Sequence, residues 1–239
     1  MKFLFLLLCV CSTYATLAQK STEIADLNAT KRALNGSFTA ITVTDGISLY
    51  LTDGNEESLA VSFSDAKYES RFKTVVDNGT LRISFDNNGL NWNDNRKRKL
   101  VAYVSFKTLT KLTASGGSDV TLTAPIKVGD LDLKFTSGTR LRGKISATSL
   151  SVAQNSGSEI SIKGNAQKIT VEATSGATFK GYDFTVDYCT ARATSGGAIR
   201  VSINKELEAR ANSGGAIHYK GDGVVKDVNV GSGGVVKKA

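Results

Sequence analysis

The chain has 239 residues, a formal net charge of +8 at pH 7, one histidine and three cysteines. The excess of basic residues favours acidic partners such as polyanionic glycans, lipid head groups or nucleic acid. A single histidine excludes metal centres and catalytic sites that require two histidines.

The first 18 residues have the pattern of a secretory signal peptide. Lys2 precedes an apolar run from Phe3 to Cys11, and small or polar residues lead to Ala18. This run is too short to cross a membrane as an ordinary helix, and no later stretch is long enough. We therefore expect cleavage after Ala18, no transmembrane segment afterwards, and export to the periplasm, the outer-membrane surface or the extracellular space. Acylation of Cys9 or Cys11, as in a lipoprotein, is the alternative.

Cleavage after Ala18 changes the charge and the cysteine count. The cleaved chain has a formal charge of +7 and keeps one cysteine, Cys189, so it has no intrachain disulfide. Export also disfavours nucleic acid as a partner for the basic residues, which leaves anionic glycans and other cell-surface components.

Residues 19–37 form a polar leader, followed by an N-terminal β region at 38–111. Ile24, Leu27 and Leu34 have a weak helical spacing, so we expect the leader to be partly helical. From Phe38 onwards, apolar residues alternate with polar ones and are interrupted by Asp-Gly and Asn-Gly dipeptides, which are typical of tight turns between strands.

A basic loop at 86–99 interrupts this β region. It contains Trp92 and the run Arg96, Lys97, Arg98 and Lys99. A solvated loop accounts for the charges, whereas an exposed tryptophan beside them favours a contact patch, because aromatic residues are enriched at binding hot spots. Both interpretations stay open.

The second half of the chain is organised by a Ser-Gly dipeptide that recurs seven times. The gaps between successive dipeptides are 22, 19, 19, 20, 18 and 19 residues. Apolar residues recur at every second position on both sides of each dipeptide, which is the period of a strand. The pattern predicts a single-stranded parallel β-helix over 112–239, with coils of about 19 residues, two short strands in each coil and a glycine corner between them. The serines are Ser115, Ser137, Ser156, Ser175, Ser195, Ser213 and Ser232.

Two single residues fit this scheme. The only proline, Pro125, lies in the longest gap and predicts a loop that lengthens its coil, because a central strand tolerates proline badly. Cys189 occupies a column otherwise filled by leucine and isoleucine, so we expect a buried thiol without chemistry.

Basic residues recur five and seven positions after the corner serines, on either side of an apolar column. They should therefore project from one face of the stack as a basic stripe, which is the predicted ligand-binding surface. A stripe of this kind also keeps an exposed sheet soluble, and that interpretation stays open. Its members are Arg142, Lys144, Lys163, Lys180, Arg200, His218 and Lys220.

The sequence carries no catalytic signature. His218 lies between two core positions and should face solvent, and the corner serines are too many for one of them to be a nucleophile. The cleaved chain holds one histidine and one cysteine, so we expect no metal site and no cofactor.

The chain resembles the DUF2807 family, described as putative auto-transporter adhesin, head GIN domain. The resemblance rests on Phe38, Ile41 and Val43 followed by Gly46, on the strand Gly79 to Ile83, on Leu112 to Gly116, and on the serial Ser-Gly coils. It runs from Phe38 to the end of the chain. The family, mostly exported proteins of Bacteroidetes-type bacteria, implies a right-handed parallel β-helix and supplies no catalytic or ligand residues.

These observations predict an exported, non-enzymatic protein with an adhesin-like or surface-binding role. An acidic polysaccharide or another anionic cell-surface component is the expected partner. A carbohydrate-active enzyme of the cell envelope is one alternative, since β-helices host such enzymes. A structural role, with homo-oligomers formed by stacking at a coil end, is the other.

Overall fold

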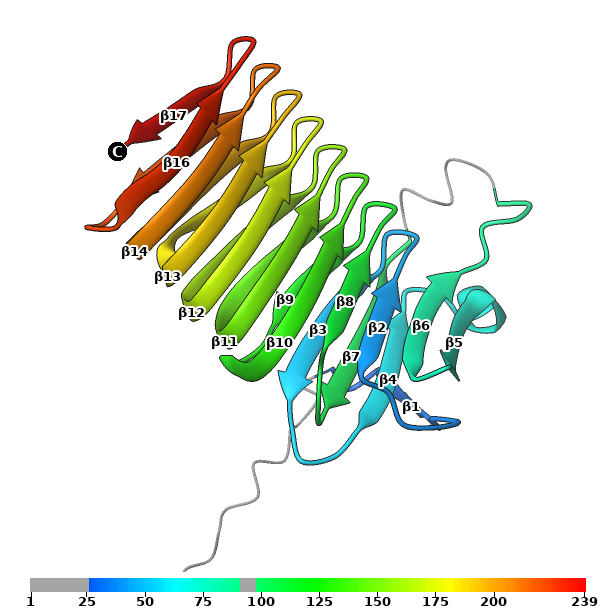
Figure 1. Ribbon diagram of the computed structural model, residues 1–239. Helices are drawn as coiled ribbons and strands as arrows, with labels where there is room; N and C mark the ends of the chain where they lie inside the picture. The colour runs from blue at the N-terminus through cyan, green and yellow to red at the C-terminus, as the bar shows by residue number, and fades with distance from the viewer. Residues whose placement is uncertain (1–25, 91–97) are drawn as a thin grey trace, which may run out of the picture.

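The computed structural model describes residues 26–90 and 98–239. The seventeen strands of this part form one sheet, which winds into a β-solenoid of about seven turns with parallel stacking (Figure 1). The 3-10 helix η1 (Ala66–Arg71) is its only helix, and no helix in the described residues is long and apolar enough to cross a membrane. The predicted all-β solenoid is confirmed.

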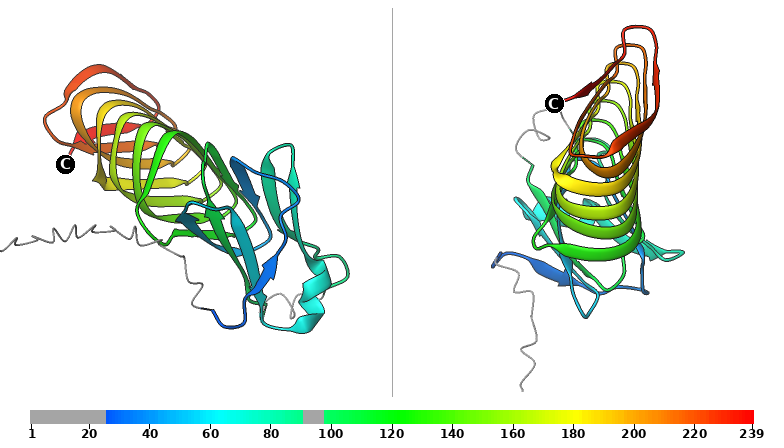
Figure 2. Two further views of the ribbon diagram at one scale, coloured as in Figure 1. Left: turned by 90° about the horizontal axis from the view of Figure 1, so that it is seen from below. Right: turned by 60° about the vertical axis from the view of Figure 1, so that its left-hand side comes forward.

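Ten strands build the repeating coils of the second half of the chain. They are β8 (Lys111–Ala114), β9 (Asp119–Leu122), β10 (Ile126–Phe135), β11 (Arg140–Gln154), β12 (Glu159–Ala173), β13 (Thr178–Ala193), β14 (Ala198–Ala211), β15 (Ala216–Lys220), β16 (Val224–Val230) and β17 (Val235–Lys238). Strands β11 to β14 have 14 to 16 residues and run from one corner to the next. The prediction of two short strands in each coil is therefore wrong for these coils, because the chain bends within one long strand opposite the corner (Figure 2).

The corner of each coil is a two-residue turn in which both residues are left-handed. Ser137 has φ 60° and Gly138 has φ 71°, and later serines and glycines repeat this pair. Two positive φ values define the turn type that joins neighbouring strands most tightly. The amide of Gly138 donates a hydrogen bond of 3.0 Å to the carbonyl of Ser156 in the next coil, and successive corners repeat this contact. The serines are therefore residues of the turn.

The first Ser-Gly dipeptide departs from this rule. Ala114 lies opposite Phe135, so the residues that align with the later turns are Gly116 and Gly117, with φ 63° and 75°. Ser115 instead precedes the turn. Positions in this coil must therefore be counted from Gly116, one residue later than Ser115.

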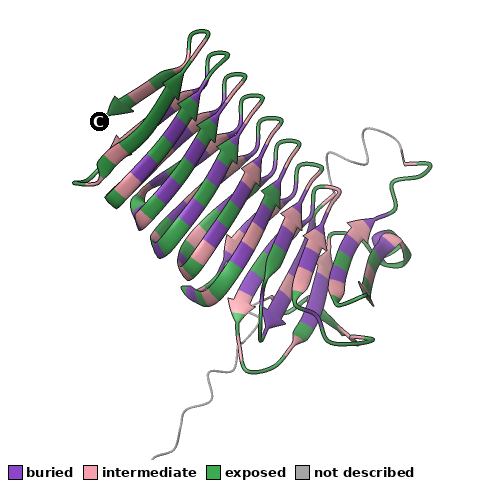
Figure 3. Cartoon of the chain, in the orientation of Figure 1, coloured by how far each residue is buried: buried purple, intermediate pink, exposed green. Residues whose placement is uncertain are grey.

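Buried and exposed residues alternate along the strands (Figure 3), and the buried side chains form the core inside the solenoid. Leu133, Val152 and Val171 lie opposite one another on adjacent strands, and each is at most 1% exposed. Burying a side chain of this size contributes about 1.5–3 kcal/mol, so the aligned apolar columns provide the main stabilisation of the stack.

Coils of unequal length stay in register because bulges on the side opposite the corner absorb the difference. Thr121 lies opposite Arg142, an offset of 21 residues, whereas Ile126 lies opposite Ile145, an offset of 19. The two extra residues leave the strand between β9 and β10, where Pro125 lies. This agrees with the loop that the proline predicts.

The N-terminal β region both extends and caps the solenoid. Strands β2 (Ala40–Val43) and β3 (Ser48–Asp53) pair in parallel with β8 and β9, and Asp45 and Gly46, with φ 66° and 74°, make the corner of this coil. Outside it, β6 (Thr80–Phe85) pairs with β2 and β7 (Leu100–Phe106) pairs with β3. Antiparallel strands β4 (Ser58–Phe63) and β5 (Phe72–Asp77) then cover this end.

The described part of the polar leader is not helical. Strand β1 (Thr30–Arg32) pairs antiparallel with β4, so the helical expectation is wrong for residues 26–37. Leu27 is 99% exposed and only Leu34 packs on the core, which leaves too few apolar contacts to hold a short helix. The predicted signal peptide lies outside the described residues.

Candidate functional site

The seven residues of the basic stripe lie on strands β11 to β15, which run side by side (Figure 1). Five positions after the corner serines, Lys180 lies opposite Arg200 and Arg200 lies opposite His218. Lys237 of β17 lies opposite His218 and extends this column. Arg142 belongs to the same column, separated from Lys180 by a serine.

The second column of the stripe lies seven positions after the corner. Lys144 lies opposite Lys163 on the adjacent strand, and Lys220 lies opposite Ser202. The ammonium of Lys220 is 4.4 Å from the centre of the Tyr182 ring, which is close enough for a cation–π interaction.

Basic side chains on adjacent strands of the stripe are about 4.8 Å apart at their backbones. Like charges in such positions repel each other. Glu159 pairs with Lys180 at 2.5 Å and Asp183 pairs with Lys163 at 3.0 Å, so two of the cations are partly neutralised. Arg142, Lys144 and Arg200 have no ion-pair partner among residues 26–90 and 98–239.

The face before the corner balances its charges in another way. We call it the mixed face, and its members are Asp132, Lys134, Glu172, Arg192, Glu208 and Arg210. Glu172 lies opposite Arg192 with an N–O distance of 3.9 Å, and Arg210 approaches Asp227 at 3.9 Å. Both signs of charge are present on this face, although Arg192 lies opposite Arg210 and Glu208 lies opposite Asp227, whereas the stripe residues are all basic.

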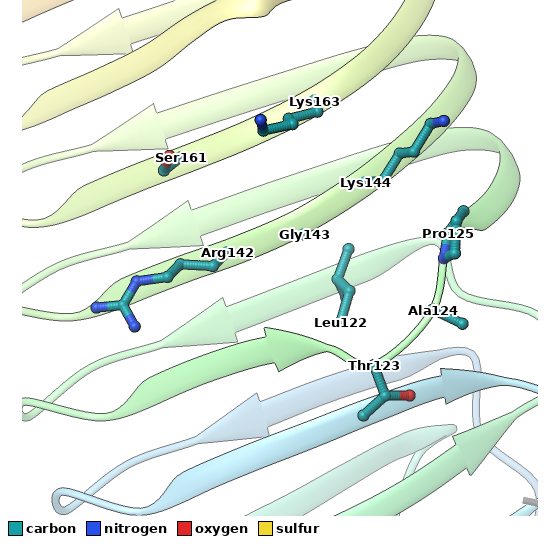
Figure 4. Close-up of a pocket in the computed structure, with 9 residues that line it drawn as sticks. All are labelled: Leu122, Thr123, Ala124, Pro125, Arg142, Gly143, Lys144, Ser161 and Lys163. Atoms are coloured by element: carbon teal, nitrogen blue, oxygen red, sulfur yellow. The ribbon is translucent and has the colours of Figure 1, made fainter.

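A hollow of about 430 Å³ adjoins the stripe where the chain leaves β9 (Figure 4). We call it the Pro125 hollow, and its lining residues are Leu122, Thr123, Ala124, Pro125, Arg142, Gly143, Lys144, Ser161 and Lys163. It lies where the two extra residues of this coil leave the sheet. A Cβ atom at Gly143 would lie 2.4 Å from the Cβ of Leu122, so a larger residue cannot be accommodated without displacing Leu122.

Two tyrosines of this face were not identified from the sequence pattern. Tyr50 stacks on Tyr103 with ring centres 5.3 Å apart, and Tyr50 lies opposite Thr121, which continues the column of Arg142. The hydroxyl of Tyr103 donates a hydrogen bond of 3.0 Å to Asp26. Tyr50 follows Asp45 by five residues, the interval that separates Arg142 from Ser137. Treating Asp45-Gly46 as a corner would have revealed this aromatic extension of the column.

Only Arg98 and Lys99 of the five predicted contact residues in the basic loop lie within the described residues. Trp92, Arg96 and Lys97 lie outside them. The guanidinium of Arg98 lies 4.2 Å from the centre of the Phe85 ring and donates a hydrogen bond of 2.9 Å to the carbonyl of Asp45. Burial lowers the pKa of Arg98. Arg98 therefore ties the loop to the first corner, whereas Lys99 is exposed.

The histidine and the buried cysteine occupy an outward and an inward column of the coils. His218 lies in the outward column between Arg200 and Lys237. Cys189 is 3% exposed, and burial raises its pKa to about 12, which keeps the thiol protonated. Within the described ranges no three histidine, cysteine or acidic side chains form a group that could hold a metal ion.

Solved structures share this fold. A putative adhesin from Bacteroides fragilis NCTC 9343 superimposes with a TM-score of 0.80 at 17% identity, covering 88% of this chain and 96% of its own. A putative adhesin from Parabacteroides distasonis ATCC 8503 gives 0.70 at 18% identity, with coverage of 88% and 96%. A protein from the same organism named "Putative lipid binding protein" gives 0.63 at 20% identity, with coverage of 87% and 95%. At these identities the likeness concerns the fold alone.

The sequence itself matches a family model. No curated protein matches the chain. The family model named "Putative auto-transporter adhesin, head GIN domain" (DUF2807) matches residues 37–223, a range that includes the first coil, the basic stripe up to Lys220 and the Pro125 hollow. The chain belongs to the DUF2807 family.

Proposed function

We propose that this protein is an exported, non-enzymatic, adhesin-like surface-binding protein whose basic stripe holds an acidic polysaccharide. The observation that carries the proposal is the register of Lys180, Arg200, His218 and Lys237, which lie directly opposite one another on successive strands. A polyanion lying along the stack would meet Lys180, Arg200 and Lys237 in turn, with His218 between the last two.

The energetics of the two faces support this interpretation. Solubility requires charges on an exposed sheet, but it does not require charges of one sign in consecutive coils. The mixed face shows that the same stack accommodates outward charges of both signs. Repulsion between Lys180 and Arg200 lowers stability in the free protein, and an anionic ligand would relieve it. The tyrosines that continue the columns add aromatic contact area, which is enriched in binding interfaces.

Membership of the family and the names of the solved relatives support a role outside the cytoplasm. The family model and two of the compared structures are named as adhesins. Together with the predicted signal peptide, this favours a location in the periplasm or at the cell surface.

The test is binding of polygalacturonate to the chain from residue 19 at low salt, with neutral dextran as the control polymer. We expect binding that weakens as salt is added, because exposed ionic contacts are screened. Replacing Lys180, Arg200 and Lys220 by glutamine removes three contacts and should cost about 1–3 kcal/mol, a five- to 150-fold loss.

The matched control replaces three cations of the mixed face, Lys134, Arg192 and Arg210, by glutamine. It changes the net charge by the same amount and should leave binding within about twofold of wild type. Equal losses in both variants would show that net charge alone attracts the polymer. Absence of binding by the wild-type chain at low salt would end the proposal.

A further inference from the structure

We propose that the Pro125 hollow binds a small organic anion that carries an aliphatic chain. The acidic group lies beside Lys144, with Arg142 and Lys163 further along the rim, and the chain lies against Leu122 and Pro125. This ligand differs from the polysaccharide proposed for the stripe, although the two sites share cationic residues at their border.

The wall of the hollow is fixed in position by the coil beneath it. The amide and the hydroxyl of Thr123 both donate to the carbonyl of Leu51, at 2.9 and 3.1 Å, and the Thr123 hydroxyl lies 2.6 Å from that of Thr52. Pro125 has a fixed φ. A wall held in this way forms a concave site before any ligand arrives, as most small-molecule sites do.

The polar side of the hollow selects an anion. Arg142 and Lys144 are exposed and have no ion-pair partner in the described part of the chain, and Lys163 lies directly opposite Lys144. Ser161 adds a hydroxyl donor at the same edge. None of the nine lining residues is acidic, so a cationic ligand finds no counter-charge there. Asp183 already pairs with Lys163 at 3.0 Å, so an acidic group in the hollow would chiefly neutralise Lys144.

The other side of the hollow is apolar. Leu122 belongs to the core and is 7% exposed, and its side chain packs closely against the backbone of Gly143 on the next strand. Ala124 and Pro125 continue this surface (Figure 4). A hydrated sugar chain gains little from such contacts, whereas an aliphatic chain does. The volume of about 430 Å³ lies at the lower end of the range for small-molecule pockets, so the chain it accepts is short.

The test is a calorimetric titration of the protein from residue 19 onwards with each of four compounds: hexanoate, hexyl phosphate, acetate and hexanol. Hexanoate and hexyl phosphate carry the same chain on a carboxylate or a phosphate, so comparing them identifies the preferred acidic group. Hexanoate should bind more than tenfold tighter than acetate, because each buried methylene tightens binding about three- to fourfold.

Two variants separate the contribution of the apolar surface to hexanoate binding from that of the positive charge. Ala124→Phe places a ring in the hollow without changing charge and should abolish hexanoate binding while polygalacturonate binding is retained. Lys144→Gln should weaken hexanoate several-fold and leave hexanol unchanged. The control Arg192→Gln on the mixed face should bind hexanoate as wild type does.

The outcomes also distinguish this inference from the proposed function. Binding of hexanoate without polygalacturonate would sink the polysaccharide proposal alone. Hexanoate affinity equal to that of acetate, or unchanged in Ala124→Phe, would overturn the hollow as a binding site.

Discussion

Alkaline pH should destabilise the folded chain through one buried thiol. Cys189 lies between Ile169 and Leu207 on adjacent strands, and burial raises its pKa from 9.0 to about 12. The folded chain therefore holds this proton more tightly than the unfolded chain does. The resulting stabilisation is complete below about pH 9 and is lost as the pH rises towards about 12. Within this window each pH unit removes about 1.4 kcal/mol from the free energy of unfolding.

Urea unfolding of the chain from residue 19, at intervals from about pH 8 to about pH 11, measures this slope. The control is Cys189→Val, which cannot ionise and suits a column of leucine and isoleucine. Tyr103, whose pKa burial raises to about 12, is present in both proteins, so its contribution cancels. Above pH 9, the free energy of unfolding of the variant should fall less steeply than that of the wild type, and the two slopes should differ by about 1.4 kcal/mol per pH unit. Parallel curves for the two proteins would refute the burial of this thiol in the core column.

Three further predictions concern the open end, the hollow and the corners. Lys238 lies in the inward column, opposite Tyr219, at the open end of the stack. Lys238→Val should therefore promote end-to-end association, measured by sedimentation, whereas Lys237→Val, which changes an outward residue, should not. Equal association of the two variants would contradict the inward placement of Lys238. Gly143→Ala should lower the free energy of unfolding in urea by about 1–3 kcal/mol, because its Cβ would overlap Leu122, and an unchanged midpoint would disprove that overlap. Gly176→Ala meets no atom within 4 Å but must keep φ 74°, so it should cost about 1–2 kcal/mol in the same assay; a larger loss would indicate packing at the corner.

The repeating coils could be predicted from sequence because a parallel stack converts spacing along the chain into columns in space. Residues at the same distance from a corner face the same way, so Arg200 and His218 could be aligned from their spacing alone. The alignment survives coils of unequal length because the bulges lie on the side opposite the corner. For example, the register between β12 and β13 shifts between Ser161 and Gly164, beyond the column that contains Lys180.

The N-terminal coils could not be predicted in the same way because their order in the stack differs from their order in the chain. The coil of β2 and β3 is followed in sequence by β6 and β7, which lie outside it, and only then by β8 and β9 on its other side. No constant period survives this arrangement. Asp45 therefore has the sequence signature of an ordinary turn residue, and the spacing of Tyr50 becomes informative only once Asp45-Gly46 is aligned with the later corners.

The ion pairs between side chains on adjacent strands could not be predicted from the sequence either. Whether Lys180 is free or neutralised depends on Glu159, which lies on the adjacent strand and two positions nearer the corner. Such diagonal pairs are within reach of long side chains but are not fixed by the register. The sequence therefore predicted the position of the stripe and overestimated its charge.

The two faces of the solenoid offer an internal comparison that bears on function. The fold dictates the corner residues and the inward columns of both faces, and it leaves the outward columns free. On the mixed face, Glu172 and Arg192 satisfy each other across adjacent strands. On the stripe, Arg200 faces a lysine on one side and a histidine on the other. Like charges in register are not peculiar to the stripe, because Arg192 also lies opposite Arg210 on the mixed face. What distinguishes the stripe is that its residues are all basic, so the proposed anion spanning several coils would relieve the repulsion around Arg200.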